Sequence, residues 1–243
     1  MVTKKDIKFI NSLKHKKFRH LNSSFIVEGK KSIAEFLDSD YELIKLFSVD
    51  CSIFNKIKNQ IKIDKSLLRK ISFLINPDDH LAIFKLSDAK PINNNNLIIA
   101  LESIRDPGNL GTIIRTCEWF GIKDIICSMN SVDCYSPKVI QSAMGSVSRV
   151  NITYLDLDTY LKSTKTIKIG ASLNGKSIYQ HNKSLDNGII VFGNEANGIS
   201  SGLFKLMDFN LSIPRFQNNN FPESLNLASS VGIILGEIKR KSI

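Results

Sequence analysis

The chain has 243 residues, a formal net charge of +10 and ordinary apolar content. This length suits one large domain or two modest ones, each able to bury a core. No apolar run approaches the roughly 20 residues needed to cross a bilayer, and the N-terminus leads into no signal-type apolar segment. We therefore expect a soluble, cytoplasmic protein with no membrane partner.

The cysteines and histidines do not suggest a metal site. The four cysteines form no C-x-x-C pair, and the four histidines are dispersed along the chain. This spacing favours reduced thiols packed as small hydrophobes, and we expect no bound metal.

Basic residues gather at the N-terminus. Residues 1–31 contain nine Lys or Arg against two acidic residues, whereas the rest of the chain has 24 basic and 21 acidic side chains. Such a cluster suits the phosphates of RNA, and a solvated lysine-rich helix would give the same pattern. The candidate RNA-binding residues are Lys14, Lys16, Lys17, Arg19, Lys30 and Lys31.

The first 87 residues mix helical and strand patterns. A helix is predicted around Ile33, Phe36 and Leu37, and apolar runs at 44–49 and 81–84 predict strands. This mixture is typical of a small α/β domain. Proline and asparagine in the segment 88–96 favour coil, which predicts a linker there.

Residues 97–243 alternate short apolar runs with amphipathic segments. Strands are predicted at 97–101, 124–127, 167–172, 189–192 and 210–213. Helices are predicted over 110–120, 136–147 and about 223–239, the second with Pro137 in its first turn. Buried strands alternating with amphipathic helices predict an α/β domain around a parallel sheet.

Three segments interrupt this pattern with glycines and polar residues just after strands, where open α/β sheets bind ligands. The first runs from Asp106 to Thr116. Its two glycines permit a tight turn, Asn109 is a candidate N-cap, and Arg115 lies off the apolar stripe of the helix. Taken alone, the segment also fits a capped surface helix.

The second segment is Gly193-Asn194-Glu195-Ala196-Asn197-Gly198, in which two glycines bracket a carboxylate at the end of an apolar strand. Glycines there would let backbone N–H groups turn toward a ligand. The third is Ile213-Pro214-Arg215, a loop, and then Ser224-Leu225-Asn226 at the start of the last helix. Each also fits an ordinary turn or helix cap.

Together, the three segments resemble the ordered motifs of the SpoU (TrmH) family of RNA ribose 2′-O-methyltransferases, in the SPOUT superfamily. They are similar to its [ND]-P-x-N-x-G-x-[IV]-x-R-[TS], G-x-E-x-x-G-[IL]-S and I-P…S-L-N patterns, over about residues 97–240. The segment Phe25-Ile26-Val27-Glu28-Gly29-Lys30-Lys31 resembles the ribosomal protein L30e-like substrate-binding domain often fused to that catalytic domain.

The resemblance implies an α/β catalytic domain (97–243) with a C-terminal trefoil knot, preceded by an L30e-like RNA-binding domain (1–87). It also implies a homodimer that uses S-adenosylmethionine on ribosomal RNA, slightly favoured, or transfer RNA. The implied cofactor-binding residues are Ala171, Gly193, Asn194, Ile213 and Leu225. The implied catalytic residues are Asn109, Arg115, Glu195, Ser224 and Asn226.

One loop departs from the family pattern. Residues 215–222 contain no glycine, although relatives usually keep one soon after the I-P pair. The cofactor contacts that the family makes there are therefore not carried over. Phe216 and Phe221 are candidates to cover the adenine, and we favour their packing against the protein instead.

The implied reaction needs a placed ribose oxygen and stabilised charge. The family proposal makes the residue at position 115 a general base. Because a guanidinium loses its proton only above about pH 12, we favour a charged Arg115 that holds a phosphate and the developing alkoxide, with Glu195 holding Arg115. A non-catalytic RNA-binding protein remains the alternative. A Rossmann-type enzyme is disfavoured because no G-x-G-x-x-G follows a predicted strand.

Overall fold

The chain divides into two compact units. The computed structural model describes residues 2–181, 185–216 and 224–241. One unit comprises Met1–Asp88 with Asp133–Arg149, and the other comprises Ala89–Val132 with Val150–Ile243. The segment 133–149 follows the predicted linker in sequence but belongs in space to the N-terminal unit. In the described part of the chain, no helix is long and apolar enough to span a bilayer.

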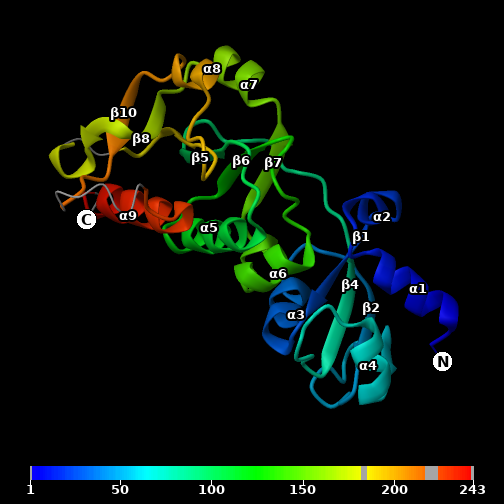
Figure 1. Cartoon of the computed structure of the whole chain (residues 1–243). Helices are drawn as coiled ribbons and strands as arrows, with labels where there is room; N and C mark the ends of the chain where they lie inside the picture. Colours follow the sequence, from blue (N-terminus) through cyan, green and yellow to red (C-terminus); the bar gives the residue numbers. More distant parts are fainter. Residues whose placement is uncertain (1, 182–184, 217–223, 242–243) are drawn as a thin grey trace. The chain divides into compact units, whose positions relative to one another are not determined.

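The N-terminal unit is built on a mixed four-stranded sheet (Figure 1). The sheet order is β1 (Ser24–Glu28), β4 (His80–Lys85), β2 (Leu43–Ser48) and β3 (Gln60–Lys62). Strand β4 pairs antiparallel with β1 and β2, and β3 pairs parallel with β2. The predicted strands at 44–49 and 81–84 are thereby confirmed as β2 and β4.

Helices bury their apolar stripes against this sheet. The helices are α1 (Lys4–Ser12), α2 (Lys16–Leu21), α3 (Lys30–Leu37) and α4 (Lys65–Ile71). Ile10 from α1 and Leu68 and Ile71 from α4 share one cluster with Ile26 and Phe47 of the strands. The helix predicted around Ile33 and Phe36 is α3, and both side chains are fully buried.

The segment 133–149 packs against α2 and β1 of the N-terminal unit through buried polar and aromatic contacts. Arg19 Nε and Nη2 donate to Asp133 Oδ2 at 2.9 and 2.5 Å, and Arg19 Nη1 donates to the Leu13 and Lys14 carbonyl oxygens at 2.9 and 2.8 Å. The ring of Tyr135 lies 4.6 Å from that of Phe25, centroid to centroid. The burial of Arg19, 2% exposed, argues against the predicted RNA contact of this residue.

The helix predicted over 136–147 is shorter than expected. Helix α6 spans Pro137–Ala143, with Pro137 in the first turn as predicted. Met144 then adopts a left-handed conformation with φ 50°, and Gly145 follows with φ 92°. A β-carbon on Gly145 would lie 2.8 Å from the Glu35 side chain, so the chain can approach α3 only with glycine there. A short 3₁₀ turn, Ser146–Ser148, completes the segment.

The C-terminal unit contains a fully parallel six-stranded sheet, as predicted. Its order is β10 (Phe209–Ser212), β8 (Lys168–Ser177), β9 (Gly188–Phe192), β5 (Leu97–Leu101), β6 (Asp124–Ser128) and β7 (Asn151–Leu155). Every residue of β5 and β9 is buried, which explains their continuous apolar runs. Strand β7 was not predicted, because each of its residues is only half-buried at the sheet edge.

Helices cover both faces of this sheet (Figure 1). Leu157 and Leu161 of α7 (Leu157–Ser163) and Leu203 of α8 (Ser201–Phe204) pack on Ile98 and Val191. On the other face, α5 (Pro107–Trp119) lies beside α9 (Leu227–Arg240). The apolar stripe of α9, Leu227, Ala228, Val231, Ile234, Leu235 and Ile238, is buried.

Candidate active site

The first motif segment forms the start of α5 at the carboxyl end of β5. The N-cap is Asp106, whose Oδ1 accepts a hydrogen bond from the Asn109 backbone N–H at 2.7 Å. The prediction of Asn109 as the N-cap is therefore wrong. Because Asp106 caps the helix and Pro107 opens its first turn, the Asn109 side chain is left for other contacts.

The second motif segment is a tight loop after β9. A β-carbon on Gly193 would lie 1.9 Å from the Gly198 carbonyl carbon, so only glycine allows the two backbone stretches to approach. Asn194 N donates to the Gly198 carbonyl at 3.0 Å, and Gly198 N donates back at 2.8 Å. The loop thus closes on itself and leaves the exposed Glu195 at its tip.

The third motif segment begins α9. Asn226 is its N-cap and accepts a hydrogen bond from the Ser229 backbone N–H at 3.2 Å. The helix therefore starts at Leu227, later than the predicted start near Glu223, which lies outside the described residues. Ser224 and Leu225 precede the cap, and both are exposed.

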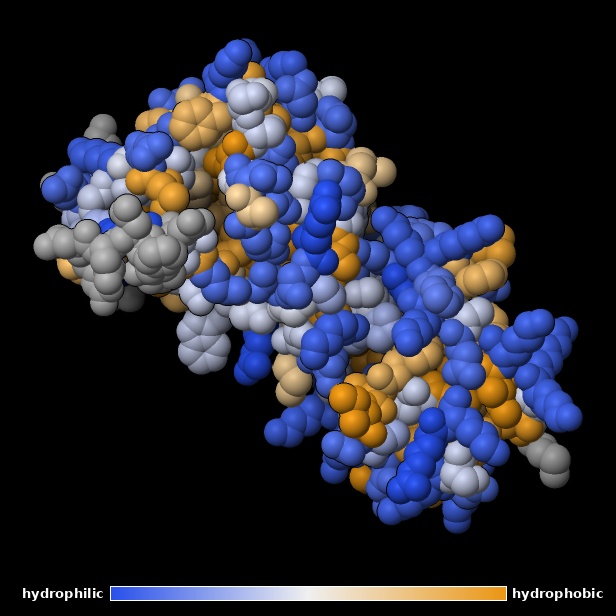
Figure 2. Space-filling view, in the orientation of Figure 1, coloured by the Kyte–Doolittle hydropathy of each residue, from blue (hydrophilic) through white to orange (hydrophobic). Residues whose placement is uncertain are grey.

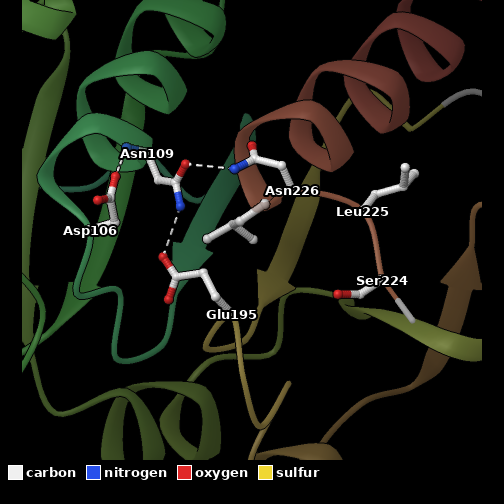
Figure 3. Close-up of a pocket in the computed structure, with 7 residues that line it drawn as sticks. Asp106, Asn109, Glu195, Ser224, Leu225 and Asn226 are labelled. Carbon is white, nitrogen blue, oxygen red and sulfur yellow. Dashed lines mark hydrogen bonds between the residues drawn. The ribbon is translucent and has the colours of Figure 1, made fainter. Parts of the chain in front are cut away.

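A hydrogen-bonded chain of amide and carboxylate side chains joins the three segments (Figure 3). Asn226 Nδ2 donates to Asn109 Oδ1 at 2.9 Å, and Asn109 Nδ2 donates to Glu195 Oε1 at 3.1 Å. Asn194 Nδ2 donates to the other carboxylate oxygen of Glu195 at 3.3 Å. The sequence places these residues up to 117 positions apart, and the fold holds them in one network.

A pocket of about 480 Å³ opens beside this network. Its described lining residues are Asp106, Asn109, Glu195, Ser224, Leu225, Asn226 and Leu227. Four of the five predicted catalytic residues and Leu225 of the predicted cofactor set therefore meet there. Asp106 and Leu227 were given no role in the site, although a D-P pair at a predicted helix start was a signal for Asp106.

Arg115 does not line the pocket of its own chain. It is exposed on α5, and among the residues that the structure describes none accepts a hydrogen bond from it. The expected contact between Glu195 and Arg115 is absent, because Glu195 binds Asn109 and Asn194 instead. Six positions separate Asn109 from Arg115, so at about 100° a residue they point to different sides of the helix.

The other predicted cofactor residues are not among the described lining residues of the pocket. Gly193 is buried, and Ala171, Asn194 and Ile213 are half-buried. The Asn194 side chain is engaged within its loop, where Oδ1 accepts hydrogen bonds from the Ala196 and Asn197 backbones at 3.0 and 3.3 Å. Within the described ranges, no group of three or more His, Cys, Asp or Glu side chains is placed to hold a metal ion.

The loop after β10 is described only in part. Phe216 is 84% exposed, so the prediction that it packs against the protein is wrong for this residue. Phe221 lies outside the described residues.

The predicted RNA-binding lysines lie on the surface of the N-terminal unit. Lys14, Lys16, Lys17, Lys30 and Lys31 are all exposed. Phe18 and Leu21 on α2 are exposed by 38% and 73%. Figure 2 accordingly shows a mainly hydrophilic surface over α1 and α2, interrupted by a hydrophobic patch. Lysines interleaved with apolar side chains suit a nucleic acid, which offers both phosphates and base faces.

Comparison with known proteins identifies relatives of both units. Residues 96–236 match the SpoU rRNA Methylase family, and residues 4–82 match the MRM3-like substrate binding domain. The 23S rRNA (guanosine(2553)-2′-O)-methyltransferase of Bacillus subtilis is 24% identical over 240 residues, which cover 96% of this chain and 95% of that protein. An uncharacterised tRNA/rRNA methyltransferase of Synechocystis is 31% identical, over 72% of this chain and 65% of its own length.

Solved structures show the same fold over both units. A protein from Porphyromonas gingivalis, assigned to the TrmH family of RNA methyltransferases, superposes with a TM-score of 0.90 at 30% identity and covers 99% of each chain. An AdoMet-bound rRNA methyltransferase from Sinorhizobium meliloti superposes with a TM-score of 0.88 at 26% identity, over 100% of this chain and 97% of that chain.

Proposed function

The chain belongs to the SpoU rRNA methylase family, and we propose that, as an S-adenosylmethionine-dependent RNA methyltransferase, it methylates a ribose 2′-hydroxyl of ribosomal RNA at the pocket beside α5 and α9. The observation that carries the proposal is the hydrogen-bonded chain Asn226–Asn109–Glu195, which joins all three motif segments around one pocket. The relatives named for ribosomal RNA favour that substrate over transfer RNA. A ribosomal RNA substrate also fits the cytoplasmic location expected from the sequence.

The pocket suits S-adenosylmethionine in size and chemistry. A volume of about 480 Å³ is within the range of cofactor clefts. The carboxylates of Asp106 and Glu195 favour a cation such as a sulfonium, and Leu225, 48% exposed, offers an apolar surface. Leu225 lines the pocket and would hold the cofactor there. The family resemblance adds the backbones of Ala171, Gly193, Asn194 and Ile213, which are not among the described lining residues. When bound, S-adenosylmethionine supplies an electrophilic methyl group on its sulfonium sulfur.

The residues of the chain place the ribose and stabilise charge. The 2′-hydroxyl would give up its proton to solvent, so negative charge develops on its oxygen. That oxygen would accept the methyl group as the bond from the methyl carbon to the sulfonium sulfur breaks. Asn109 and Asn226, held in their orientations by hydrogen bonds, and the exposed Ser224 hydroxyl would bind the ribose. Arg115, as a planar cation, would hold the adjacent phosphate and the developing alkoxide.

A homodimer would bring Arg115 to the reaction. Arg115 lies outside the pocket of its own chain, so we propose that Arg115 of one copy serves the pocket of the other. Trp119, at the end of α5, is 85% exposed and is a candidate interface residue. Light scattering is expected to give twice the mass of one chain.

Cofactor binding tests the proposal for the pocket. Calorimetry with S-adenosylmethionine, in buffer containing a metal chelator, is expected to show binding at one site per chain. The demethylated product, S-adenosylhomocysteine, is expected to compete. An absence of binding at saturating cofactor would contradict the proposal.

Lysines of the N-terminal unit are expected to supply phosphate contacts. Replacing Lys14 and Lys17 with alanine should weaken RNA binding and flatten the dependence of log affinity on log salt by about one unit for each lost contact. Deletion of residues 1–87 is a poorer test, because residues 133–149 would lose their packing partners. The matched control replaces Lys123 and Lys165, two exposed lysines of the C-terminal unit. Equal slopes for both double variants would mean that Lys14 and Lys17 do not contact RNA.

A further inference from the structure

Ser103, two residues after β5, has an uncommon backbone conformation. Its φ is 57°, in the left-handed region that residues with a β-carbon seldom occupy. Such a conformation persists only where the surrounding structure holds it, and residues of this kind are enriched at functional sites. Ser103 lies in the same unit as the pocket, three positions before Asp106.

All three polar groups of Ser103 are hydrogen-bonded. Its backbone N–H donates to Ser128 Oγ at 2.7 Å, and its own Oγ accepts from Asn130 Nδ2 at 2.8 Å. Its carbonyl oxygen accepts from Asn194 Nδ2 at 2.8 Å. Ser103 therefore joins Ser128 at the end of β6, and Asn130 in the turn after it, to the loop after β9, which holds Asn194.

The bond to Asn194 reaches the pocket. The Asn194 amide nitrogen also donates to Glu195 Oε2 at 3.3 Å, and its amide oxygen accepts from the backbones of Ala196 and Asn197. Glu195 in turn accepts from Asn109, which accepts from Asn226. The direction of the Ser103 carbonyl thus fixes one end of the amide chain that lines the pocket.

We propose that Ser103 is a positioning residue for methyl transfer. Its left-handed backbone turns the carbonyl oxygen toward the Asn194 amide and so fixes the loop that presents Glu195 to Asn109. The hydroxyl group has the lesser role of tying Ser103 to Asn130. The role of Ser103 rests on the proposed function, because it acts only through the residues of that pocket.

Two substitutions distinguish the role of the Ser103 backbone conformation from the role of its hydroxyl group. Glycine adopts the left-handed conformation without steric cost but lacks the hydroxyl. Threonine keeps the hydroxyl, but its β-branched side chain makes this conformation a genuine outlier. We expect Ser103→Gly to keep kcat within about twofold of the wild type, and Ser103→Thr to lower it about tenfold or more, since small displacements of placed groups are costly to catalysis.

The assay measures kcat with RNA and S-adenosylmethionine both saturating, at a temperature well below the melting temperature of every variant. A purely structural role would lower the melting temperature and leave kcat unchanged. If the Ser103→Thr variant does not fold, Ser103→Ala replaces it, because alanine and glycine both lack the hydroxyl and differ in their tolerance of the left-handed region. A lower kcat for alanine than for glycine supports the proposal.

Wild-type kcat in Ser103→Thr, or an equal loss in the threonine and glycine variants, would overturn the proposal. Where Ser103→Ala replaces Ser103→Thr, equal kcat values for the alanine and glycine variants would also overturn the proposal. A wild-type protein that neither binds S-adenosylmethionine nor methylates RNA contradicts the proposed function itself. Active variants with equal kcat contradict only the role of Ser103.

Discussion

Replacing Arg115 with alanine is expected to lower methyl transfer about 10²- to 10³-fold while cofactor affinity stays near that of the wild type. Arg115 is exposed and does not line the pocket that we assign to S-adenosylmethionine. Its removal should therefore change stability by less than about 1 kcal/mol. Methyl transfer to RNA and calorimetry with the cofactor, measured on the same preparation, check both parts of this prediction.

The Arg115→Lys variant separates the two roles considered for this residue. Lysine keeps the charge but loses the planar fork that binds phosphate through two hydrogen bonds. If Arg115 acts as a clamp, the lysine variant should keep weak activity that changes little between pH 7 and 9, where lysine stays protonated at its usual pKa of about 10.4. If position 115 supplies a base, activity should rise steeply with pH, because lysine loses its proton more readily than arginine.

The Gly193→Ala variant is expected to lose cofactor affinity by roughly 100-fold, as overpacking by a few kcal/mol would predict. A β-carbon there would lie 1.9 Å from the Gly198 carbonyl carbon, so the loop must open and Glu195 must move from Asn109. Calorimetry checks this loss. The control is Gly202→Ala in α8, where a β-carbon meets nothing within 4 Å. A Gly193→Ala protein with wild-type affinity would show that the loop does not shape the cofactor site.

Mixing these two variants tests whether the site is shared between copies. The Arg115→Ala chain keeps an intact pocket, and the Gly193→Ala chain keeps an intact arginine. If Arg115 of one copy serves the pocket of the other, a dimer of one chain of each variant contains one complete site. Activity should therefore return when the two variants are unfolded, mixed and refolded together. An inactive mixture, shown to contain mixed dimers, would place Arg115 and its pocket in the same chain.

The C-terminal fold could be predicted well because its strands are buried on both faces. Strand β5 has the predicted bounds of 97–101, since all five of its side chains are apolar and buried. The half-buried edge strand β7 gives no such run, and it was missed. The parallel α/β fold and the family are confirmed, whereas the trefoil knot stays a prediction.

The site could be predicted from its three motifs, but the pairing of its side chains could not. Glu195 was expected to hold Arg115, yet it binds Asn109 because Asp106 takes over the capping of α5. Sequence spacing along one helix cannot reveal which of its side chains binds a carboxylate from a distant loop.

Arg19 illustrates the same limit in the N-terminal unit. It lies among exposed lysines in the sequence, but its partner Asp133 is 114 positions away. An ion pair between residues so far apart in the sequence leaves no local sequence pattern. The count of basic residues in the first 31 positions therefore predicted, wrongly, that Arg19 contacts RNA.

The chemistry of the product tests the central claim most directly. Ribosomal RNA from cells lacking the gene is incubated with the protein and S-adenosylmethionine, digested to nucleosides and analysed by mass spectrometry, beside RNA from cells that have the gene. We predict one ribose 2′-O-methylated nucleotide that is present in RNA from cells that have the gene and missing in RNA from cells that lack it. Incubation with the protein should restore this nucleotide to the RNA that lacks it. A methyl group on a base, or no transfer to RNA by a protein that binds the cofactor, would contradict the account.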